Sequence, residues 1–508
     1  MPITHSCQLS PALHIRGRLY GFVGFDGAAR LPARLKNPFK INQLELPLVA
    51  RPNVTALIVA SALFMENIDS TVIATSLPAV AADLGTDPIR LKLALTSYLL
   101  SLAVFIPISG WAADRFGAKT IFRSAIGVFL LGSICCSLSS TLPEFVLARI
   151  LQGAGGAMMT PVGRLVVLRT TPKDQILSAL AWLSIPALIG PMIGPPLGGF
   201  ITTYFDWRWI FWINVPVGAV GVLLVTFLID NIRMPEVVPL DRTGFALSGV
   251  GLSALIFGLS VMGQRMMPLP ASLALVLGGL ACIALYVRHA RRVAHPLLDL
   301  DLLKVPTFRA SVFGGFFFRV GVGAIPFLLP LTLQLGLGMN PFQAGSLVFV
   351  TTIGALLMKF TAQPIVRRFG FRRVLIVNGL VSATILGSMG LFALGPATAV
   401  IITVLLVGGF FRSLQFSCIS ALAYADIPQK HMSRATSFAS VAQQVGLSTG
   451  VTASAFILEF QRAGRPGGEI IPGDFLTAFV VVAGIAAVSI LVFRQLSPAA
   501  GGQMSSHV

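Results

Sequence analysis

The sequence predicts an all-α polytopic membrane protein, because charged residues are scarce and long apolar segments recur along the chain. Of its 508 residues, 55% are hydrophobic and only 11% are charged, whereas soluble domains carry about 25% charged residues. The mean hydropathy of +0.84 agrees. So few charges cannot cover the surface of a water-soluble chain of this length. The composition therefore argues against a soluble enzyme, a disordered scaffold and a coiled coil.

Fourteen segments are long and apolar enough to cross a bilayer, which takes about 20 residues in a helix. Their uninterrupted apolar character favours helices, since barrel strands alternate between apolar and polar residues. The predicted spans are 54–76, 91–113, 120–140, 144–168, 178–203, 207–229, 243–262, 270–288, 308–333, 342–362, 373–393, 397–424, 436–458 and 473–493.

The distribution of Lys and Arg predicts the orientation of these spans. With the N-terminus in the cytoplasm, 27 of the 37 Lys and Arg residues fall in cytoplasmic segments and six fall outside. This positive-inside bias places both termini in the cytoplasm. It also accounts for the net charge of +18 without a nucleic-acid partner. The five Cys residues show no ligand spacing, so we expect neither a metal site nor a disulfide framework.

The chain divides into five predicted segments, and two of them are related bundles. Arg-Phe-Gly ends at Gly117 after the second span and at Gly370 after the tenth, 253 residues later. Such repeats are typical of transporters and predict two six-helix bundles with two extra central spans. The segments are a basic N-terminal tail or mis-called start (1–53), an N-terminal half (54–229), an extra-helix region (230–307), a C-terminal half (308–495) and a C-terminal tail (496–508).

Two acids lie inside the first predicted span. Glu66 and Asp69 are three residues apart, so they occupy similar faces of a helix. An acid at membrane depth costs at least about 2.5 kcal/mol and usually has a function. Burial disfavours the charged form of a carboxylate, which suits a group that loads and releases a proton. The alternative is a structural carboxylate paired with a cation.

Arg149 in the fourth span is the natural counterion of Asp69. It lies five residues from the outer end of its span, and Asp69 lies seven from the outer end of the first. At about 1.5 Å per residue, their depths match within roughly 3 Å. We expect either an ion pair that separates during proton transfer or a permanent structural pair.

Three further groups of residues are candidates for a role in transport. Glycines four apart in the fifth span, with adjacent prolines, predict a smooth packing face and a bend; they are Gly190, Pro191, Gly194, Pro195, Gly198 and Gly199. In the loop after the second span, Asp114 is expected to hold a neighbouring helix end in one conformation and release it in another; its companions are Gly110, Arg115, Gly117 and Lys119. Arg319 and Arg412, near mid-membrane without an acid, predict either a polar cavity that attracts an anionic group or hydrogen bonds to carbonyls.

Over about residues 54–495 the chain resembles the fourteen-spanner drug:proton antiporters of the major facilitator superfamily. Gly110–Lys119 is similar to the loop motif of that superfamily, with Ala118 in place of the usual cation, and Gly190–Gly199 is similar to its antiporter motif. The matching motifs also include Asp69–Pro78, Leu147–Gly156, Trp207–Gly218, Asp241–Gly244 and His295–Asp299. The second loop copy has Arg367 where Asp114 stands, so control by the two loops is expected to be asymmetric.

The resemblance implies a multi-pass exporter of the bacterial inner membrane that confers multidrug efflux and antibiotic resistance. Two bundles would rock about a central cavity, with Asp69, Glu66 and Arg149 coupling a proton to export. We expect no cofactor, because the proton gradient supplies the energy. The expected partners are a small-molecule substrate, protons and the lipid bilayer. Nucleic acid is not expected, and the chain is expected to act as a monomer that accessory efflux proteins could join.

There are four alternatives to drug export. A narrow exporter of a metabolite, such as an amino acid, siderophore or lysolipid, would share every motif. A proton-coupled importer conflicts with the Gly190–Gly199 motif, and a non-transporting receptor or scaffold has no large soluble loop here. An enzyme is least expected. Gly153–Gly156 superficially resembles a nucleotide-binding loop but lies inside a span.

Overall fold

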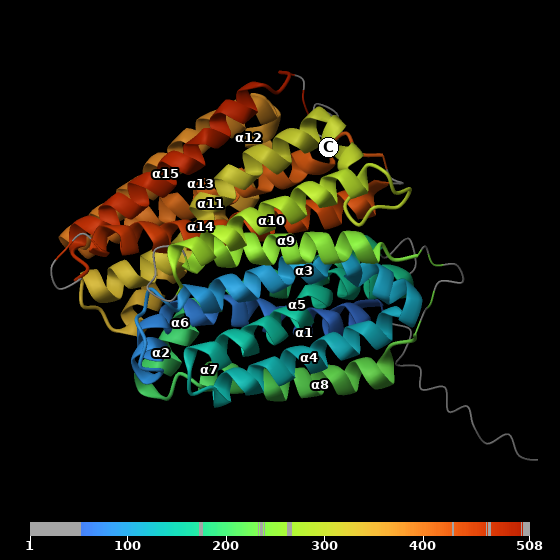
Figure 1. Ribbon diagram of the computed structural model, residues 1–508, viewed down its shortest axis with the longest axis horizontal. Coiled ribbons are helices and arrows are strands. Elements are labelled where there is room, and N and C mark those ends of the chain that lie inside the picture. The colour runs from blue at the N-terminus through green and yellow to red at the C-terminus, as the bar shows by residue number, and fades with distance from the viewer. Residues whose placement is uncertain are drawn as a thin grey trace, which may run out of the picture. The chain divides into compact units, whose positions relative to one another are not determined.

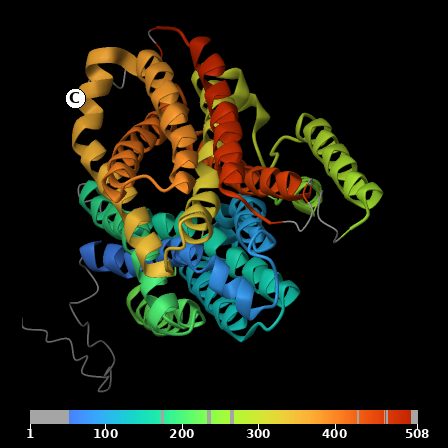
Figure 2. The same cartoon turned by 90° about the vertical axis from the view of Figure 1, so that its left-hand side faces the viewer.

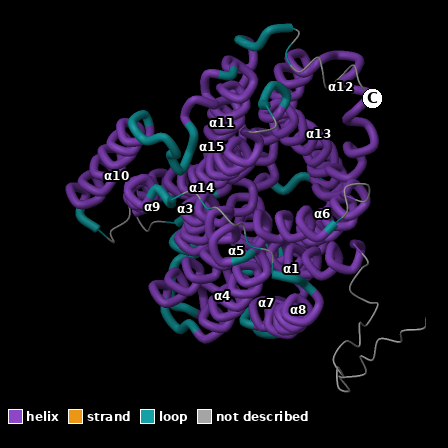
Figure 3. The backbone as a smooth tube through the Cα atoms, turned by 90° about the vertical axis from the view of Figure 1, so that its right-hand side faces the viewer, coloured by secondary structure: helices purple, strands orange, loops and turns teal. Residues whose placement is uncertain are grey.

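A computed structural model describes residues 52–500, apart from 172–175, 232, 234–236, 238, 262–266, 429–430, 464, 466–468 and 499. These residues belong to one compact unit, Leu48–Val508. Every regular element among them is a helix (Figure 3). The predicted tail 1–53 lies almost wholly outside the described residues, as do the last eight residues of the C-terminal tail.

The helices follow the predicted spans in chain order (Figure 1). The N-terminal half contains α1 (Pro52–Val72), η1 (Ile73–Thr75), α2 (Leu77–Asp83), α3 (Lys92–Phe116), α4 (Ala118–Leu138), α5 (Leu142–Thr170), α6 (Ile176–Tyr204), α7 (Trp209–Trp212) and α8 (Asn214–Leu228). The extra pair is α9 (Arg242–Val261) and α10 (Leu269–Ala290). The C-terminal half contains η3 (Leu300–Lys304), α11 (Pro306–Leu331), η4 (Thr332–Gly336), α12 (Pro341–Ser388), η5 (Met389–Leu394), α13 (Thr398–Tyr424), α14 (Met432–Ala463) and α15 (Pro472–Arg494).

Among the described residues, twelve helical segments are long and apolar enough to cross a membrane, rather than the fourteen expected. The two that are missing from this set are α5 and α6, although both are helices of 29 residues at the predicted positions. In α5 the polar side chains of Arg149 and Gln152 interrupt the apolar sequence. In α6 the side chains of residues 176–188 lie outside the described set. The count of fourteen therefore stays a prediction.

The sequence repeat marks the same structural feature in both halves. Gly117, between α3 and α4, has φ 95° and ψ 137°. Gly370 has φ 72° and ψ 155° and breaks α12 into two helices that match the predicted spans 342–362 and 373–393. Side chains with a Cβ atom rarely adopt these angles. The Arg-Phe-Gly repeat thus places a glycine where each half turns from one span into the next.

The helices of the two halves form separate groups, and two pairs of helices make the largest contacts between them. Figure 2 shows the N-terminal helices, blue to green, together on one side and the C-terminal helices, yellow to red, on the other. Across the boundary, α6 packs against α12 and α3 packs against α14. Helix α9 packs against α3, α14 and α10. Only 17% of the most apolar 18-residue stretch of α10 is buried inside the protein, so this helix presents most of its apolar surface outward.

Replacing Gly370 by Ala should destabilise the protein by about 1–3 kcal/mol. Nothing lies within 4 Å of a Cβ atom added there, so the cost comes from the backbone alone. Gly484→Ala in α15 is the matched control, because its added Cβ also meets nothing and its backbone is helical. Thermal unfolding of the purified protein in detergent should show a lower midpoint for Gly370→Ala only. Equal midpoints would contradict the strain argument.

Candidate functional site

A buried ion pair lies at the centre of the N-terminal half. Arg149 Nη1 of α5 donates to Asp69 Oδ2 of α1 at 2.8 Å, and both side chains are fully buried. The structure therefore brings together the two residues that matched in predicted depth. An isolated charge in this environment would be very costly, whereas a hydrogen-bonded pair offsets much of that cost.

Polar side chains from three further elements surround the carboxylate of Asp69. Gln152 Nε2 and Asn214 Nδ2 each donate to Asp69 Oδ1 at 2.8 Å. Both amides also donate to Ser133 Oγ, at 2.7 and 3.2 Å. Helices α1, α4, α5 and α8 thus meet at a single buried polar network.

Arg149 is held by aromatic rings as well as by Asp69. Its guanidinium carbon lies 4.4 Å from the centre of the Tyr98 ring and 5.9 Å from that of Phe211, within cation–π range. Its Nη1 also donates to Gln152 Oε1 at 2.5 Å. Arg149 Nε and Nη2 and Tyr98 Oη are buried without a hydrogen-bond partner among the described residues. The network therefore retains unused hydrogen-bonding capacity beside the ion pair.

Glu66, one helical turn before Asp69, lies in a different environment. Its carboxylate accepts a hydrogen bond from Thr160 Oγ1 at 3.0 Å and lines a cavity of about 520 Å³. Asp69 is not among the residues that line this cavity. Ligand sites typically enclose about 300–1,000 Å³. Thr160 also lines the cavity, and the remaining lining residues are Leu63, Asn67, Leu102, Ile106, Gly156, Ala157, Pro161, Arg164, Ser440, Gln443 and Gln444.

The cavity receives side chains from both halves of the protein. α1, α3 and α5 contribute from the N-terminal half, and Ser440, Gln443 and Gln444 of α14 contribute from the C-terminal half. Gln444 Oε1 is buried without a described hydrogen-bond partner. The wall thus combines one acid, Glu66, one cation, Arg164, several neutral polar groups and an apolar surface, a set suited to an amphiphilic ligand.

The predicted glycine strip of α6 packs closely against α1, beside the two acids. A Cβ atom at Gly190 would lie 2.7 Å from Asn67 Cβ, one at Gly194 would lie 2.0 Å from Thr71 Oγ1, and one at Gly198 would lie 2.2 Å from the Val72 carbonyl. Gly199 faces α12 instead, and a Cβ atom added there would lie 2.3 Å from the Pro341 carbonyl oxygen.

The prolines of this motif also lie at the contact between the halves. Thr75 Oγ1 donates to the Pro195 carbonyl at 3.3 Å. The same carbonyl closely approaches Gly345 of α12, where an added Cβ atom would lie 2.2 Å from it. Pro191 is partly buried in the same helix. Helix α6 therefore contacts α1 on one side and the C-terminal half on another.

In the loop motif, Asp114 forms an ion pair with Arg169 near the end of α5. A Cβ atom at Gly117 would clash with Asn231, whose Nδ2 donates to Thr120 Oγ1 at 3.1 Å. Arg115 is exposed, Lys119 is partly buried, and Gly110 faces open space. Asp114 thus contacts a cation at a neighbouring helix end, and its role in gating stays a prediction.

Two ion pairs connect the halves at the side that the topology assigns to the exterior. Lys92 Nζ of α3 donates to Glu459 Oε2 of α14 at 2.9 Å, and the Lys92 side chain is fully buried. Arg462 of α14 pairs with Asp87, which precedes α3. The sequence places these residues in outer loops or at span ends, but it does not indicate which residues of the two halves meet.

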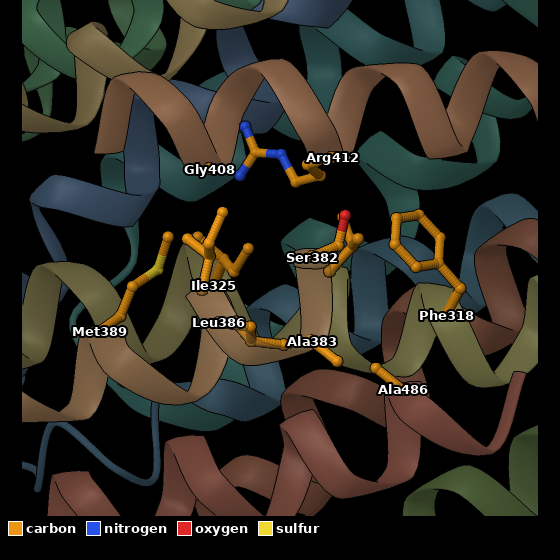
Figure 4. A pocket seen from close by; sticks show the side chains of 11 residues that line it. Phe318, Ile325, Ser382, Ala383, Leu386, Met389, Gly408, Arg412 and Ala486 are labelled. Atoms are coloured by element: carbon orange, nitrogen blue, oxygen red, sulfur yellow. The ribbon is translucent and has the colours of Figure 1, made fainter. Parts of the chain in front are cut away.

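The two mid-span arginines of the C-terminal half do not line the cavity at Glu66. Arg412 lines a much smaller cavity inside the C-terminal half (Figure 4) and donates to Thr351 Oγ1 at 3.4 Å. Arg319 is 3% exposed and lies 5.6 Å from the centre of the Phe416 ring. Neither has an ion-pair partner among the described residues. The predicted attraction of these two residues for an anionic group stays a prediction.

Sequence reasoning missed Gln152 and Asn214, although a signal for the first was present. Arg149-Ile-Leu-Gln152 has a counterpart in Arg412-Ser-Leu-Gln415. Gln415 Oε1 accepts from Asn378 Nδ2 at 2.8 Å, so each half buries a glutamine of this motif beside an asparagine. Asn214 lies inside the segment Trp207–Gly218 that carried the resemblance, but nothing in the sequence joins it to Asp69.

These features define a class of protein: a helical transporter of two related bundles with a central cavity lined by both. Comparison with known proteins agrees. The family model described as Major Facilitator Superfamily matches residues 59–293 and 311–504. The chain belongs to the major facilitator superfamily, whose members are transporters rather than enzymes.

Curated relatives match most of the chain. A Citrobacter koseri protein with the provisional name multidrug resistance protein MdtD is 39% identical over 86% of this chain and 93% of its own length. A protein of the same name from Pectobacterium atrosepticum is 38% identical, with 87% and 95% covered.

Solved structures show the same fold at low sequence identity. The crystal structure of a D-xylose–proton symporter has a TM-score of 0.63 at 15% identity, covering 88% of this chain and 98% of that one. The POT family transporter PepTSo has a TM-score of 0.64 at 16% identity, covering 90% and 98%. At these identities the likeness concerns the fold alone.

Removing the charge of Asp69 should destabilise the protein strongly. Asp69→Asn leaves Arg149 buried without its counterion, which typically costs about 3–5 kcal/mol. Asp83→Asn removes the partner of Arg208 in a partly exposed pair with a separation of 2.7 Å, and should cost less than about 1 kcal/mol. Midpoints of thermal unfolding in detergent compare the two variants. An Asp69→Asn protein as stable as Asp83→Asn would show that the buried pair is not a structural anchor.

Proposed function

We propose that this protein is a proton-coupled antiporter that exports drugs or other amphiphilic small molecules across the bacterial inner membrane. The observation that carries the proposal is the position of Glu66, an acid in a cavity of about 520 Å³ lined by both halves. A second acid, Asp69, lies one turn away in a network that excludes it from the cavity lining. The provisional name of the relatives, multidrug resistance protein, supports the same reading.

The proposed membrane arrangement has fourteen spans and both termini in the cytoplasm. It is supported by helices α5 and α6 at predicted span positions and by the concentration of Lys and Arg in alternate loops. In this arrangement α9 and α10 are the two extra central spans. The protein would work as a monomer without a cofactor and would use the proton gradient as its energy source. Accessory efflux proteins could join it.

We assign the two acids different parts in proton coupling. The Asp69 carboxylate already accepts three hydrogen bonds, from Arg149, Gln152 and Asn214. Glu66 has one neutral partner, Thr160, among the described residues. Glu66 is therefore the better placed to take up a proton and to exchange it for a substrate in the cavity. Asp69 and Arg149 then hold α1 against α5 and separate only if α1 moves.

Alternating access would use the contacts between the halves as its moving surfaces. The glycine strip of α6 lets α1 approach within van der Waals distance, and α6 packs in turn on α12. In this arrangement the ion pairs Lys92–Glu459 and Arg462–Asp87 would hold the exterior side closed. A proton that enters through 100 mV supplies about 2.3 kcal/mol, enough for roughly fiftyfold accumulation of substrate.

Inverted membrane vesicles from an efflux-deficient bacterium test the proposed function directly. The vesicles are energised to an acid interior, and lipophilic cations, neutral drugs and anions are added while a dye reports the interior pH. The wild-type protein should release protons on addition of a substrate. Glu66→Gln should abolish this release, because an amide side chain cannot take up a proton and release it again near neutral pH. Asp83→Asn serves as the matched control acid outside the cavity and should retain the response.

Three results would change the proposal. Proton release that survives in Glu66→Gln but is lost in a folded Asp69→Asn protein would move the proton site to Asp69. Proton release without compound dependence would argue against antiport. No response to any compound, with the protein present in the membrane, would contradict broad drug export and favour the narrow exporter of a metabolite.

Reversing one charge of the outer pair should favour an open exterior side. Lys92→Glu places two acids together, whereas Lys92→Glu with Glu459→Lys restores an opposite-charge pair. Ala455→Cys, fully buried about one turn from Glu459, reports opening through its rate of labelling by an impermeant maleimide in a background without the natural cysteines. Labelling from outside should rise in the single variant and fall again in the double variant.

Arg208→Glu is the control, since its partners Asp83 and Asp206 lie in the same half. Equal rates of labelling in the wild type and in Lys92→Glu would show that the Lys92–Glu459 pair does not keep the exterior side closed. Equal acceleration by Arg208→Glu would show that any lost outer charge has this effect.

A further inference from the structure

A large cavity with basic walls lies beside the segment that joins the extra helices to the C-terminal half. It has a volume of about 980 Å³ and lies among the end of α10, the η3 segment, the start of α11 and the start of α14. The sequence topology assigns this side of the protein to the cytoplasm. Its basic lining residues are Arg291, Lys304, Arg309, His431 and Arg434.

The two acids of this cavity are already paired. Asp299 accepts from Arg434 at 3.2 Å, and Asp301 lies 2.7 Å from Lys304. Arg291 and Arg309 have no ion-pair partner in the part of the chain that the structure describes. The cavity thus has an excess of two positive charges, carried by two exposed guanidinium groups.

An apolar groove continues from this cavity along α11. The groove, about 310 Å³, shares Arg309 with the basic cavity. Its walls include Ala310, Phe313 and Phe317 of α11 and Val492 and Leu496 at the end of α15. At about 1.5 Å per residue, Phe313 and Phe317 lie roughly 6 and 12 Å deeper along the helix than Arg309. Phe313 is 49% exposed, so the apolar wall is open to an occupant.

We propose that this cavity and groove together form a binding site for an anionic phospholipid. The phosphate of the headgroup would lie between Arg291 and Arg309, and one acyl chain would follow the groove past Phe313 and Phe317. Guanidinium groups bind phosphate through paired, charge-assisted hydrogen bonds. Basic pockets beside transmembrane helices on the cytoplasmic side are suited to anionic headgroups.

The combination of the two features favours a lipid over a free phosphate. A free phosphate ion would use the arginines but would gain nothing from an apolar groove that begins at the same residue. A lipid with a zwitterionic headgroup would fill the groove but would leave the excess positive charge uncompensated. The site is distinct from the cavity at Glu66 and shares no lining residue with it, so the inference does not rest on the proposed transport activity.

Native mass spectrometry of the full-length protein in detergent tests the site with defined lipids. Phosphatidylglycerol should bind the wild type more tightly than phosphatidylcholine with the same acyl chains. The double variant Arg291→Gln, Arg309→Gln should bind phosphatidylglycerol at least about tenfold more weakly, since each cation near an anionic headgroup contributes about 1 kcal/mol. The double variant Arg288→Gln, Arg292→Gln is the matched control, because it removes two exposed cations of the same region that line neither the cavity nor the groove.

A second pair of measurements distinguishes lipid from free phosphate. Phe313→Gln should weaken the binding of long-chain phosphatidylglycerol and leave that of a dihexanoyl analogue nearly unchanged, and inorganic phosphate should not displace the long-chain lipid. Thermal unfolding midpoints identify any variant that fails to fold. Displacement by inorganic phosphate, together with no effect of Phe313→Gln, would assign the site to the free ion and overturn the lipid proposal. Equal losses in both arginine variants, or no preference for phosphatidylglycerol, would overturn it as well.

Discussion

The pairing of Asp69 with Arg149 is the constraint around which the N-terminal half is arranged. Neither charge could remain at this depth alone, because an uncompensated buried charge costs several kcal/mol. Their separation of 2.8 Å fixes α1 against α5, and the amides of Gln152 and Asn214 bring α5 and α8 to the same carboxylate. The close packing of α6 on α1 then follows from the glycines that face this segment.

The two halves share a fold but not a charge pattern. At the spacing of 253 residues that relates Gly117 to Gly370, Glu66 corresponds to Arg319 and Asp114 corresponds to Arg367. These two acids are thus replaced by cations, whereas Asp69 corresponds to Val322. Among the described residues, Arg319 and Arg412 have no ion-pair partner, whereas Asp69 and Asp114 each have one. Both acids of the candidate site, Glu66 and Asp69, thus belong to the N-terminal half, and the C-terminal half contributes Ser440, Gln443 and Gln444 to the cavity.

Much of this arrangement could be predicted from the sequence because the bilayer imposes length and charge rules. The length of the apolar segments located the helices. The matching depths of Asp69 and Arg149 in their predicted spans indicated that these two residues meet. The neighbours of these residues could not be predicted, since they depend on which helix faces meet. Lys92 is an example: the sequence places it at the outer end of a span, and only the structure shows that it is fully buried against Glu459 of the other half. The sequence left two alternatives open for Arg319 and Arg412, a polar cavity or hydrogen bonds to carbonyls, and neither residue lines the cavity at Glu66.

The extra helix α9 restricts how the halves can move. It contacts α3, where the rings of Phe105 and Phe245 lie 6.1 Å apart, and α14, where Ser260 Oγ and Thr452 Oγ1 lie 2.9 Å apart. These are the two helices whose ends carry the Lys92–Glu459 pair. A motion that separates α3 from α14 must therefore break or slide one of the contacts of α9. Because α10 packs mainly on α9, the extra pair would follow whichever half keeps its contact.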